Sequence, residues 1–319
     1  MKAIVQDRYG SPDVLEFKDI DRPVPGDGDV LVRVAAAGVD PGVWHLLSGL
    51  PYALRLMGFG LRTPKVRVRG RDVSGTVEAV GSAVTRFRPG DAVFGISEGT
   101  FAEYTCAAED RFVAKPAVLS FEEAAAVPIS ALTALQAVRS GRVAPGQRVL
   151  VIGAAGGVGS FAVQLARSAG AHVTGVCSTG KVDLVRSLGA DEVVDYTRSG
   201  LGSGYDVILD TAGNRPLSVL RRALTAAGTL VLVGGEGGGR WLGSVSRVLR
   251  ASVLSPFVRQ RLVGLFSRER LVDLELLGSL VSDGSLRVVV DRSFPLGLAG
   301  DAVAYVHKGH SAGKVVVAV

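Results

Sequence analysis

A glycine-rich segment at residues 149–159, VLVIGAAGGVG, holds the residues best suited to binding a reactive cofactor. An apolar strand is expected to run into a tight turn and then a helix, which is the setting of a dinucleotide fingerprint. Gly156 would let the backbone approach a pyrophosphate, Gly159 would let the helix pack against the strand, and the helix N-terminus would offer N–H groups to phosphates. Because Ala154 replaces the first glycine of G-x-G-x-x-G, a glycine-rich turn without a ligand is the alternative. The predicted cofactor contacts here are Ala155, Gly156, Gly157, Val158 and Gly159.

The end of the next expected strand indicates which nucleotide would bind. Sites for NAD usually place Asp or Glu there, where the carboxylate accepts a hydrogen bond from the ribose 2′-hydroxyl. This chain has Ser178, Thr179 and Lys181 instead. A carboxylate would repel a 2′-phosphate, whereas hydroxyl groups and a lysine would bind it. The pattern favours NADPH, and the alternative is that Lys181 is simply an exposed residue of the first helical turn.

The elements that would position these residues alternate regularly along the chain. Apolar strands are expected at 148–153, 172–177, 192–196, 205–210 and 228–234, with helices at 158–169, 181–188 and 215–226. Strands that are apolar throughout and alternate with helices indicate a parallel sheet covered on both faces. The predicted fold class is therefore α/β, with a doubly wound, Rossmann-type parallel sheet.

The chain before residue 115 has a different sequence pattern. Short β-rich runs at 30–35, 72–80 and 91–96 are separated by glycine and proline, which favours a barrel-like or irregular β domain. Ser120 and Glu123 form a capping-box pattern that begins an Ala-rich helical run to residue 139. After residue 268 we expect a helix, a strand at 287–290, a helix at 298–308 and a strand at 314–319, which return to the first domain.

Composition limits the class of protein. The chain has 319 residues, is 47% hydrophobic and carries a formal net charge of +6. The basic residues are mostly scattered arginines, so we expect a basic surface with phosphate binding and no nucleic-acid partner. Two isolated cysteines fit a reducing compartment. We see neither a signal-peptide pattern nor an apolar stretch of membrane-spanning length, and therefore expect a soluble, cytoplasmic protein.

Several further motifs, taken in order, resemble one known family. They are GRDVSGTV at 70–77, RFRPGDAVFG at 86–95, GTFAEY at 99–104, AVP at 126–128, ALTA at 131–134 and GAD at 189–191. Together with the segment at 155–159 they resemble the medium-chain dehydrogenase/reductase superfamily, in particular its zinc-free quinone oxidoreductase (zeta-crystallin-like) group. The resemblance implies a β-rich GroES-like catalytic domain at 1–121 and 271–319, a Rossmann NADPH-binding domain at 122–270, and a homodimer.

The same resemblance implies additional cofactor contacts and the absence of a metal. Residues similar to those around the family's 2′-phosphate, ribose and nicotinamide are Tyr196, Ala212, Thr133, Val233 and Gly234. Arg71 and Asp72 stand where zinc alcohol dehydrogenases carry a ligand histidine and its glutamate neighbour. The ligand cysteine near 38–40 and the four-cysteine structural cluster are also missing from the sequence. Catalytic zinc needs about three protein ligands, so no metal site is predicted.

Without zinc, the substrate itself must accept hydride readily. Quinones and α,β-unsaturated carbonyls do so because the added charge spreads onto a conjugated oxygen, which hydrogen-bond donors or water can protonate. Candidate catalytic residues are Asp40, which could accept a hydrogen bond, His45, and Tyr52, which could donate one. The family commonly has Asn at the position of Asp40. Alternatively Tyr52 is a wall or core aromatic and His45 caps a loop.

The segment 237–265 is the most unusual stretch. Apolar residues at 242, 245, 249 and 253 fall on one helical face, with Arg247 and Arg250 elsewhere. The segment could be a lid over the pocket, a dimer contact, or a weak contact of 240–261 with an anionic membrane surface. The function predicted for the whole chain is NADPH-dependent reduction of a quinone or enone. The alternatives are a carbonyl or enoyl reductase of a biosynthetic pathway and a non-catalytic NADPH-binding redox sensor.

Overall fold

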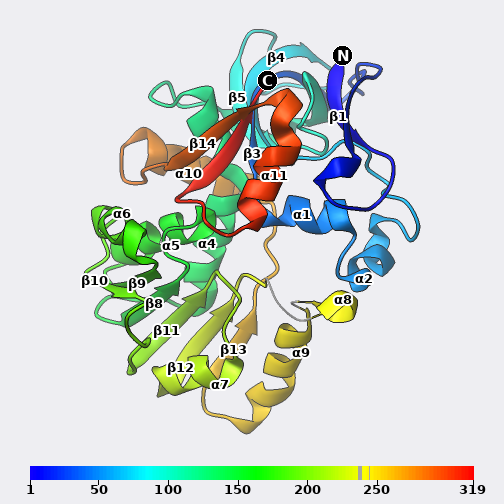
Figure 1. Ribbon diagram of the computed structural model, residues 1–319. Helices are drawn as coiled ribbons and strands as arrows, with labels where there is room; N and C mark the ends of the chain where they lie inside the picture. Colours follow the sequence, from blue (N-terminus) through cyan, green and yellow to red (C-terminus); the bar gives the residue numbers. More distant parts are fainter. Residues whose placement is uncertain (236–238, 244) are drawn as a thin grey trace. The chain divides into compact units, whose positions relative to one another are not determined.

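Six parallel strands form the sheet of residues Thr133–Arg268, in the order β10-β9-β8-β11-β12-β13 (Figure 1). The computed structural model describes residues 1–235, 239–243 and 245–319. The strands are β8 (Arg148–Ile152), β9 (His172–Cys177), β10 (Glu192–Asp195), β11 (Tyr205–Asp210), β12 (Leu224–Leu232) and β13 (Arg261–Gly264). The order reverses between β8 and β11, which is the switch point of a doubly wound sheet. The predicted α/β fold class is confirmed.

Helices cover both faces of this sheet, which is why its strands are apolar throughout. They are α4 (Pro128–Gly141), α5 (Gly157–Ser168), α6 (Val182–Ser187), α7 (Leu217–Ala223) and α9 (Val245–Leu254). The short helix α8 (Gly239–Leu242) has no buried residue. The helix predicted at 215–226 is wrong at its end, because Leu224 already belongs to β12. The edge strand β13 was not predicted from its four residues, only one of which is buried.

Residues Met1–Leu132 and Glu269–Val319 form a second unit. Its main sheet has the order β14-β15-β3-β4-β5-β7, with β6 paired to β3, and β1 and β2 form a separate pair. The strands are β1 (Lys2–Gln6), β2 (Leu15–Asp19), β3 (Asp29–Val39), β4 (Asp72–Val80), β5 (Ala92–Ile96), β6 (Tyr104–Ala108), β7 (Phe112–Ala114), β14 (Val290–Pro295) and β15 (Lys314–Ala318). Because β15 pairs with β3, the C-terminal strand completes the N-terminal sheet.

The helices of this unit are α1 (Pro41–Ser48), α2 (Tyr52–Leu54), α3 (Phe121–Ala125), α10 (Leu271–Ser282) and α11 (Ala299–His307). The helical run predicted from Ser120 is divided into α3 and α4, because Pro128 lacks an N–H group and begins a new helix. The predicted capping box at Ser120 and Glu123 is confirmed. The strand predicted at 287–290 is wrong and lies at Val290–Pro295. None of the helices that the structure describes is long and apolar enough to span a bilayer.

A buried ion pair joins β4 to β15. The Lys314 ammonium lies 2.8 Å from Asp72 Oδ2, and the two side chains are 2% and 0% exposed. The backbone N–H of Ile129 donates to Asp72 Oδ1 at 2.7 Å, and Asp40 Oδ2 lies 3.9 Å from the ammonium. Burial disfavours the charged form of Lys314, but attraction to Asp72 and Asp40 outweighs that effect and raises the pKa of Lys314.

We expect Asp72→Asn to destabilise this unit strongly, because it removes the nearest counter-charge of a buried ammonium. The loss should be about 3–5 kcal/mol of unfolding free energy. Unfolding in guanidinium chloride, followed by Trp44 fluorescence in a Trp241→Phe background, would measure it. The double variant Asp72→Leu/Lys314→Met removes both charges and should lose much less. Equal unfolding midpoints for Asp72→Asn and the parent would contradict this account.

Candidate functional site

The turn between β8 and α5 is built for close approach of backbone. Gly153 has a φ of 81°, and a Cβ atom on Gly159 would overlap the carbonyl oxygen of Gly153. Gly156 is the N-cap residue of α5 and makes no side-chain cap. The first N–H groups of a helix have no partner within the helix, so here they are available to a ligand. This geometry fits the pyrophosphate role predicted for 155–159.

The loops after β11 and β12 pack against each other at the same edge of the sheet. A Cβ atom on Gly213, whose φ is 67°, would overlap the backbone of Gly234. The N–H groups of Val233 and Gly234 donate to the Asp210 carbonyl oxygen at 3.0 and 3.1 Å. Thr211 Oγ1 donates to the Ile152 carbonyl oxygen at 2.7 Å. The carboxyl ends of β8, β11 and β12 therefore bring Ala212, Val233 and Gly234 to the edge that carries the glycine-rich turn.

A partly buried arginine at this edge was missed from the sequence. Arg247 Nη2 donates to Asp210 Oδ2 at 2.6 Å and to the Arg215 carbonyl oxygen at 2.9 Å. Within the described residues, Arg247 Nε and Nη1 and Arg215 Nε are buried without an acceptor. Buried donors without a partner are costly, so these guanidinium groups fit an anionic ligand. No local signal marks the pair, since Arg247 is 37 residues from Asp210.

The end of β9 is where the sequence places the 2′-phosphate contacts. Ser178 and Lys181 are half-buried there, and the Tyr196 N–H donates to the Cys177 carbonyl oxygen at 3.1 Å. The Tyr196 ring is 52% exposed, and the Arg215 guanidinium lies 6.0 Å from its centroid. Burial and the Asp195 carboxylate raise the pKa of Cys177, and the charge of Lys181 partly opposes them. Ser178, Thr179, Lys181 and Tyr196 thus gather at one strand end.

Sheet pairing adds a carboxylate that the order of residues along the chain did not reveal. Asp195 pairs in register with Cys177, and its Oδ2 accepts a hydrogen bond from Thr179 Oγ1 at 2.6 Å. Thr197 donates to the other carboxylate oxygen from its N–H and its hydroxyl, and Arg198 lies 3.5 Å away. The Thr179 hydrogen bond in particular lowers the pKa of Asp195. The carboxylate is therefore ionised and already committed to neighbouring side chains.

Asp40, His45 and Tyr52 lie in the other unit, around α1. Asp40 is the N-cap residue of α1, where its Oδ1 accepts from the Gly42 N–H at 3.0 Å, and it also helps to neutralise Lys314. His45 Nδ1 lies 2.9 Å from the Leu50 carbonyl oxygen, which agrees with the loop-capping alternative. Tyr52 begins α2, and the Arg55 guanidinium lies 4.9 Å from its ring. Thr133 lies half-buried within α4.

The two positions that replace zinc-binding residues make ion pairs. Arg71 pairs with Glu269 and, at 3.1 Å, with Glu98, while Asp72 pairs with Lys314. Attraction to the surrounding carboxylates outweighs burial and raises the pKa of Arg71. Within residues 1–235, 239–243 and 245–319, no group of three or more His, Cys, Asp or Glu side chains is placed to hold a metal ion.

Comparison with known proteins identifies two matching family models. An alcohol dehydrogenase GroES-like domain matches 26–117, and a zinc-binding dehydrogenase domain matches 188–317. The chain is 32% identical to the chloroplast envelope quinone oxidoreductase homolog of Arabidopsis thaliana, covering 99% of this chain and 98% of that one. It is also 32% identical to the mitochondrial NAD(P)H oxidoreductase RTN4IP1 of Mus musculus, covering 99% and 89%. The solved quinone oxidoreductase of Coxiella burnetii superposes with a TM-score of 0.87 at 30% identity, covering 100% and 99%.

Replacing Gly159 by alanine should weaken dinucleotide binding. The added methyl group would push α5 away from Gly153 and misdirect the N–H groups of its first turn. We expect the dissociation constant for NADPH to rise about tenfold or more, which is ~1.4 kcal/mol or more. Calorimetric titration would measure it. Gly200→Ala is a matched control, since nothing lies within 4 Å of its added Cβ. Equal affinity of the two variants would contradict the assigned site.

Proposed function

The chain belongs to the quinone oxidoreductase group of the medium-chain dehydrogenase/reductase superfamily, and from this premise we propose that it is an NADPH-dependent, zinc-independent reductase of quinones or α,β-unsaturated carbonyls. It is an oxidoreductase that uses a nicotinamide cofactor, as its relatives indicate. The observation that carries the proposal is the approach of α5 to Gly153, which leaves the first N–H groups of α5 to a dinucleotide pyrophosphate.

The preference for NADPH is supported by the charges at the end of β9. Lys181 is the cation there, and Arg215 lies over the Tyr196 ring. Asp195 would repel a phosphate, but its two oxygens already accept hydrogen bonds from Thr179 and Thr197. Because Thr179 donates its hydroxyl hydrogen to Asp195, the 2′-phosphate would depend mainly on Lys181 and Ser178. The sequence alone did not distinguish Thr179 from Ser178 and Lys181 as a contact of the 2′-phosphate.

Zinc independence is supported by what occupies the positions of the missing ligands. A guanidinium group has no lone pair to give a metal. Arg71 is further held between Glu98 and Glu269, and Asp72 is held by Lys314. A reaction that used a metal at this place would first have to break the buried ion pair of Asp72 with Lys314, which is costly.

The acceptor would then be one that stabilises the charge added by hydride. The nicotinamide, when bound, supplies the hydride. A conjugated acceptor carries the resulting charge on its oxygen, where a hydroxyl donor or water can protonate it. Asp40 is held at the start of α1 and can only accept hydrogen bonds as a carboxylate, so it is the weakest of the three catalytic candidates. Tyr52 carries a hydroxyl group, which as a chemical group can donate a hydrogen bond.

Charge reversal at Lys181 tests the cofactor preference. Lys181→Glu should raise the dissociation constant for NADPH at least about tenfold, because it removes a charge-assisted hydrogen bond to the 2′-phosphate. Binding of NADH, which lacks that phosphate, should change much less. Arg222→Glu makes the same change of charge at the exposed end of α7 and should spare both cofactors. An equal effect of Lys181→Glu on the two cofactors would argue against the NADPH assignment.

An acceptor panel tests the chemistry. Nicotinamide absorbance would be followed with quinones, enones, aldehydes and saturated ketones, with and without a chelator. We expect turnover of conjugated acceptors with NADPH at the same rate in both conditions. Loss of activity with the chelator would reject zinc independence. Tight NADPH binding without turnover of any acceptor would favour the redox-sensor alternative.

A further inference from the structure

Positive charge is concentrated in one part of the chain. Residues 211–268 contain nine arginines and one acidic residue, Glu236. The whole chain has 36 basic and 30 acidic residues, so the remainder has 27 and 29. The net positive charge of the protein therefore comes entirely from this segment, which belongs to the nucleotide-binding sheet and its covering helices.

Part of this charge lies away from the predicted cofactor site. Arg221 and Arg222 are in the last turn of α7, which leads directly into the start of β12. Arg259 comes just before the start of β13. In a parallel sheet the starts of all strands lie at the edge opposite to their carboxyl ends. These three arginines are therefore at the amino edge, whereas Gly153, like the rest of the glycine-rich turn, is at the carboxyl edge.

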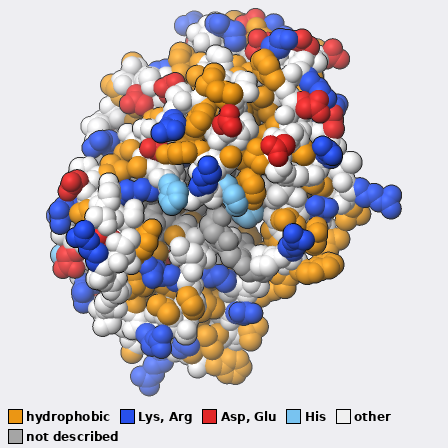
Figure 2. Space-filling view, viewed as in Figure 1, with side chains coloured by type: hydrophobic (Ala, Val, Ile, Leu, Met, Phe, Trp, Pro, Cys, Tyr) orange, Lys and Arg blue, Asp and Glu red, His pale blue; other side chains and the backbone are white. Residues whose placement is uncertain are grey.

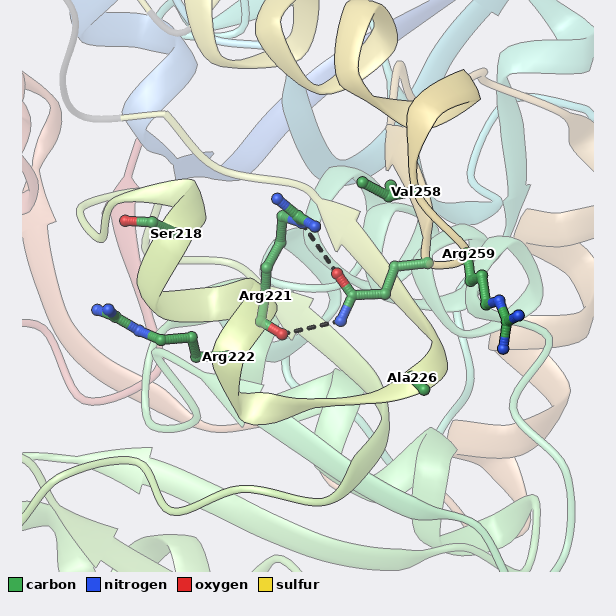
Figure 3. Close-up of a pocket in the computed structure, with 7 residues that line it drawn as sticks. Ser218, Arg221, Arg222, Ala226, Val258 and Arg259 are labelled. Carbon is green, nitrogen blue, oxygen red and sulfur yellow. Dashed lines mark hydrogen bonds between the residues drawn. The ribbon is translucent and has the colours of Figure 1, made fainter.

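The three arginines line an open pocket of about 490 Å³ (Figure 3). Arg221 Nε donates to the Gln260 side-chain oxygen at 2.9 Å, and the Gln260 amide donates back to the Arg221 carbonyl oxygen at 2.8 Å. Arg222 and Arg259 extend outward on either side of this fixed pair. Among the described residues, no carboxylate pairs with Arg222 or Arg259. The pocket therefore offers uncompensated guanidinium groups to an anion.

An apolar stripe lies beside the pocket. Helix α9 packs against the sheet through Ala251, Val248 and Leu254, and a Cβ atom on Gly264 of β13 would overlap Val248. This packing corrects the face inferred from the sequence, since residues 249 and 253 of that face point to solvent. Among exposed side chains, Leu249, Val253 and Phe257 are 51%, 69% and 81% exposed.

The stripe and the arginines share one surface. Arg250 follows Leu249 in α9 and is exposed, and Arg259 comes two residues after Phe257. α7 and α9 contribute to the same core cluster, so they lie on the same side of the sheet. Figure 2 shows hydrophobic and basic side chains intermixed over the lower part of the molecule, where α7 and α9 are drawn in Figure 1.

We infer that this surface, made of Leu249, Val253 and Phe257 with Arg222, Arg250 and Arg259, docks the protein onto an anionic lipid bilayer. Apolar side chains on the exposed face of α9 would enter the boundary between headgroups and acyl chains. The arginines around them would meet lipid phosphates. α9 has ten residues, which is too short to span a bilayer, so in this arrangement the helix would lie along the bilayer surface.

Two other occupants fit this surface less well. In a symmetric contact with a second copy, the same patch lies on both sides, so these arginines would face each other without carboxylates between them. A nucleic acid would neutralise the arginines but would leave Leu249, Val253 and Phe257 against phosphates and water. An anionic bilayer satisfies both the charge and the apolar side chains. Because this surface contains none of the residues assigned to the cofactor site, the inference does not depend on the proposed reaction.

Co-sedimentation of the full chain with lipid vesicles tests whether this surface binds an anionic bilayer. We expect binding to equimolar phosphatidylcholine and phosphatidylglycerol, little binding to phosphatidylcholine alone, and weakening with added salt. Arg222→Gln/Arg259→Gln should weaken binding about 25-fold, at about fivefold for each arginine near an anionic surface. Arg88→Gln/Arg186→Gln removes the same charge from exposed positions outside the surface and should leave binding unchanged. Equal weakening by the two double variants would overturn the inference.

The apolar contribution needs a separate variant. Leu249→Ser/Phe257→Ser changes side chains that are already exposed, so the fold should persist while binding to the anionic vesicles falls at least about tenfold. No sedimentation of the parent protein with anionic vesicles would overturn the inference. Self-association that this variant abolishes, without vesicle binding, would also overturn the inference and would assign the surface to a second copy. Binding of a DNA duplex without vesicle binding would overturn it too and would assign the surface to nucleic acid.

Discussion

The ion pair between Asp72 and Lys314 is the constraint on which the N-terminal unit depends. It joins residues 242 positions apart, at a place where both side chains are buried. A buried ammonium without a counter-charge is strongly unfavourable, so the burial of Lys314 in β15 requires Asp72 beside it. The same carboxylate accepts from the Ile129 N–H at the start of α4. The Asp72 side chain therefore holds both the C-terminal strand β15 and the start of helix α4 in place.

All strands in the sheet of Thr133–Arg268 run in one direction, so the sheet has a carboxyl edge and an amino edge, and different residues gather at each. Its carboxyl edge depends on glycine, because Gly159, Gly213 and Gly234 approach other backbone too closely for a side chain. That edge can present N–H groups to a dinucleotide. The amino edge carries arginines instead, of which Arg222 and Arg259 are exposed to solvent. Because all strands run in one direction, the two edges can change independently, and a basic surface at one need not disturb nucleotide binding at the other.

Local patterns predicted the elements well. The strands His172–Cys177 and Tyr205–Asp210 lie where periodicity placed them, since strands buried on both faces are apolar along their whole length. The glycines of the cofactor turn were also apparent, because the positions of glycine depend on local backbone geometry. The β13 strand is short and only partly buried, and its four residues carry no comparable signal.

What the sequence could not predict depends on pairing between distant elements. Asp195 reaches Thr179 only because β10 lies beside β9, and Arg247 reaches Asp210 only because α9 packs on the same sheet. The packed face of α9 was misjudged for a related reason. Periodicity finds apolar positions on a helix, but the available space on the sheet decides which of them pack. Gly264 of β13 leaves room for Val248, and the face carrying Leu249 is turned outward.

The proposed chemistry and the ion pairs of the N-terminal unit constrain each other. Arg71 and Asp72 stand where a zinc enzyme would place ligands, and each is held in an ion pair, which is buried in the case of Asp72. Exchanging a ligand for a guanidinium removes a Lewis acid but adds a fixed charge, which needs carboxylates such as Glu98 and Glu269 around it. On the proposed function, a site altered in this way would not polarise an unactivated carbonyl through a metal. In the proposed reaction the acceptor itself would have to stabilise the charge added with the hydride, and a conjugated acceptor can do so because the charge spreads onto its oxygen.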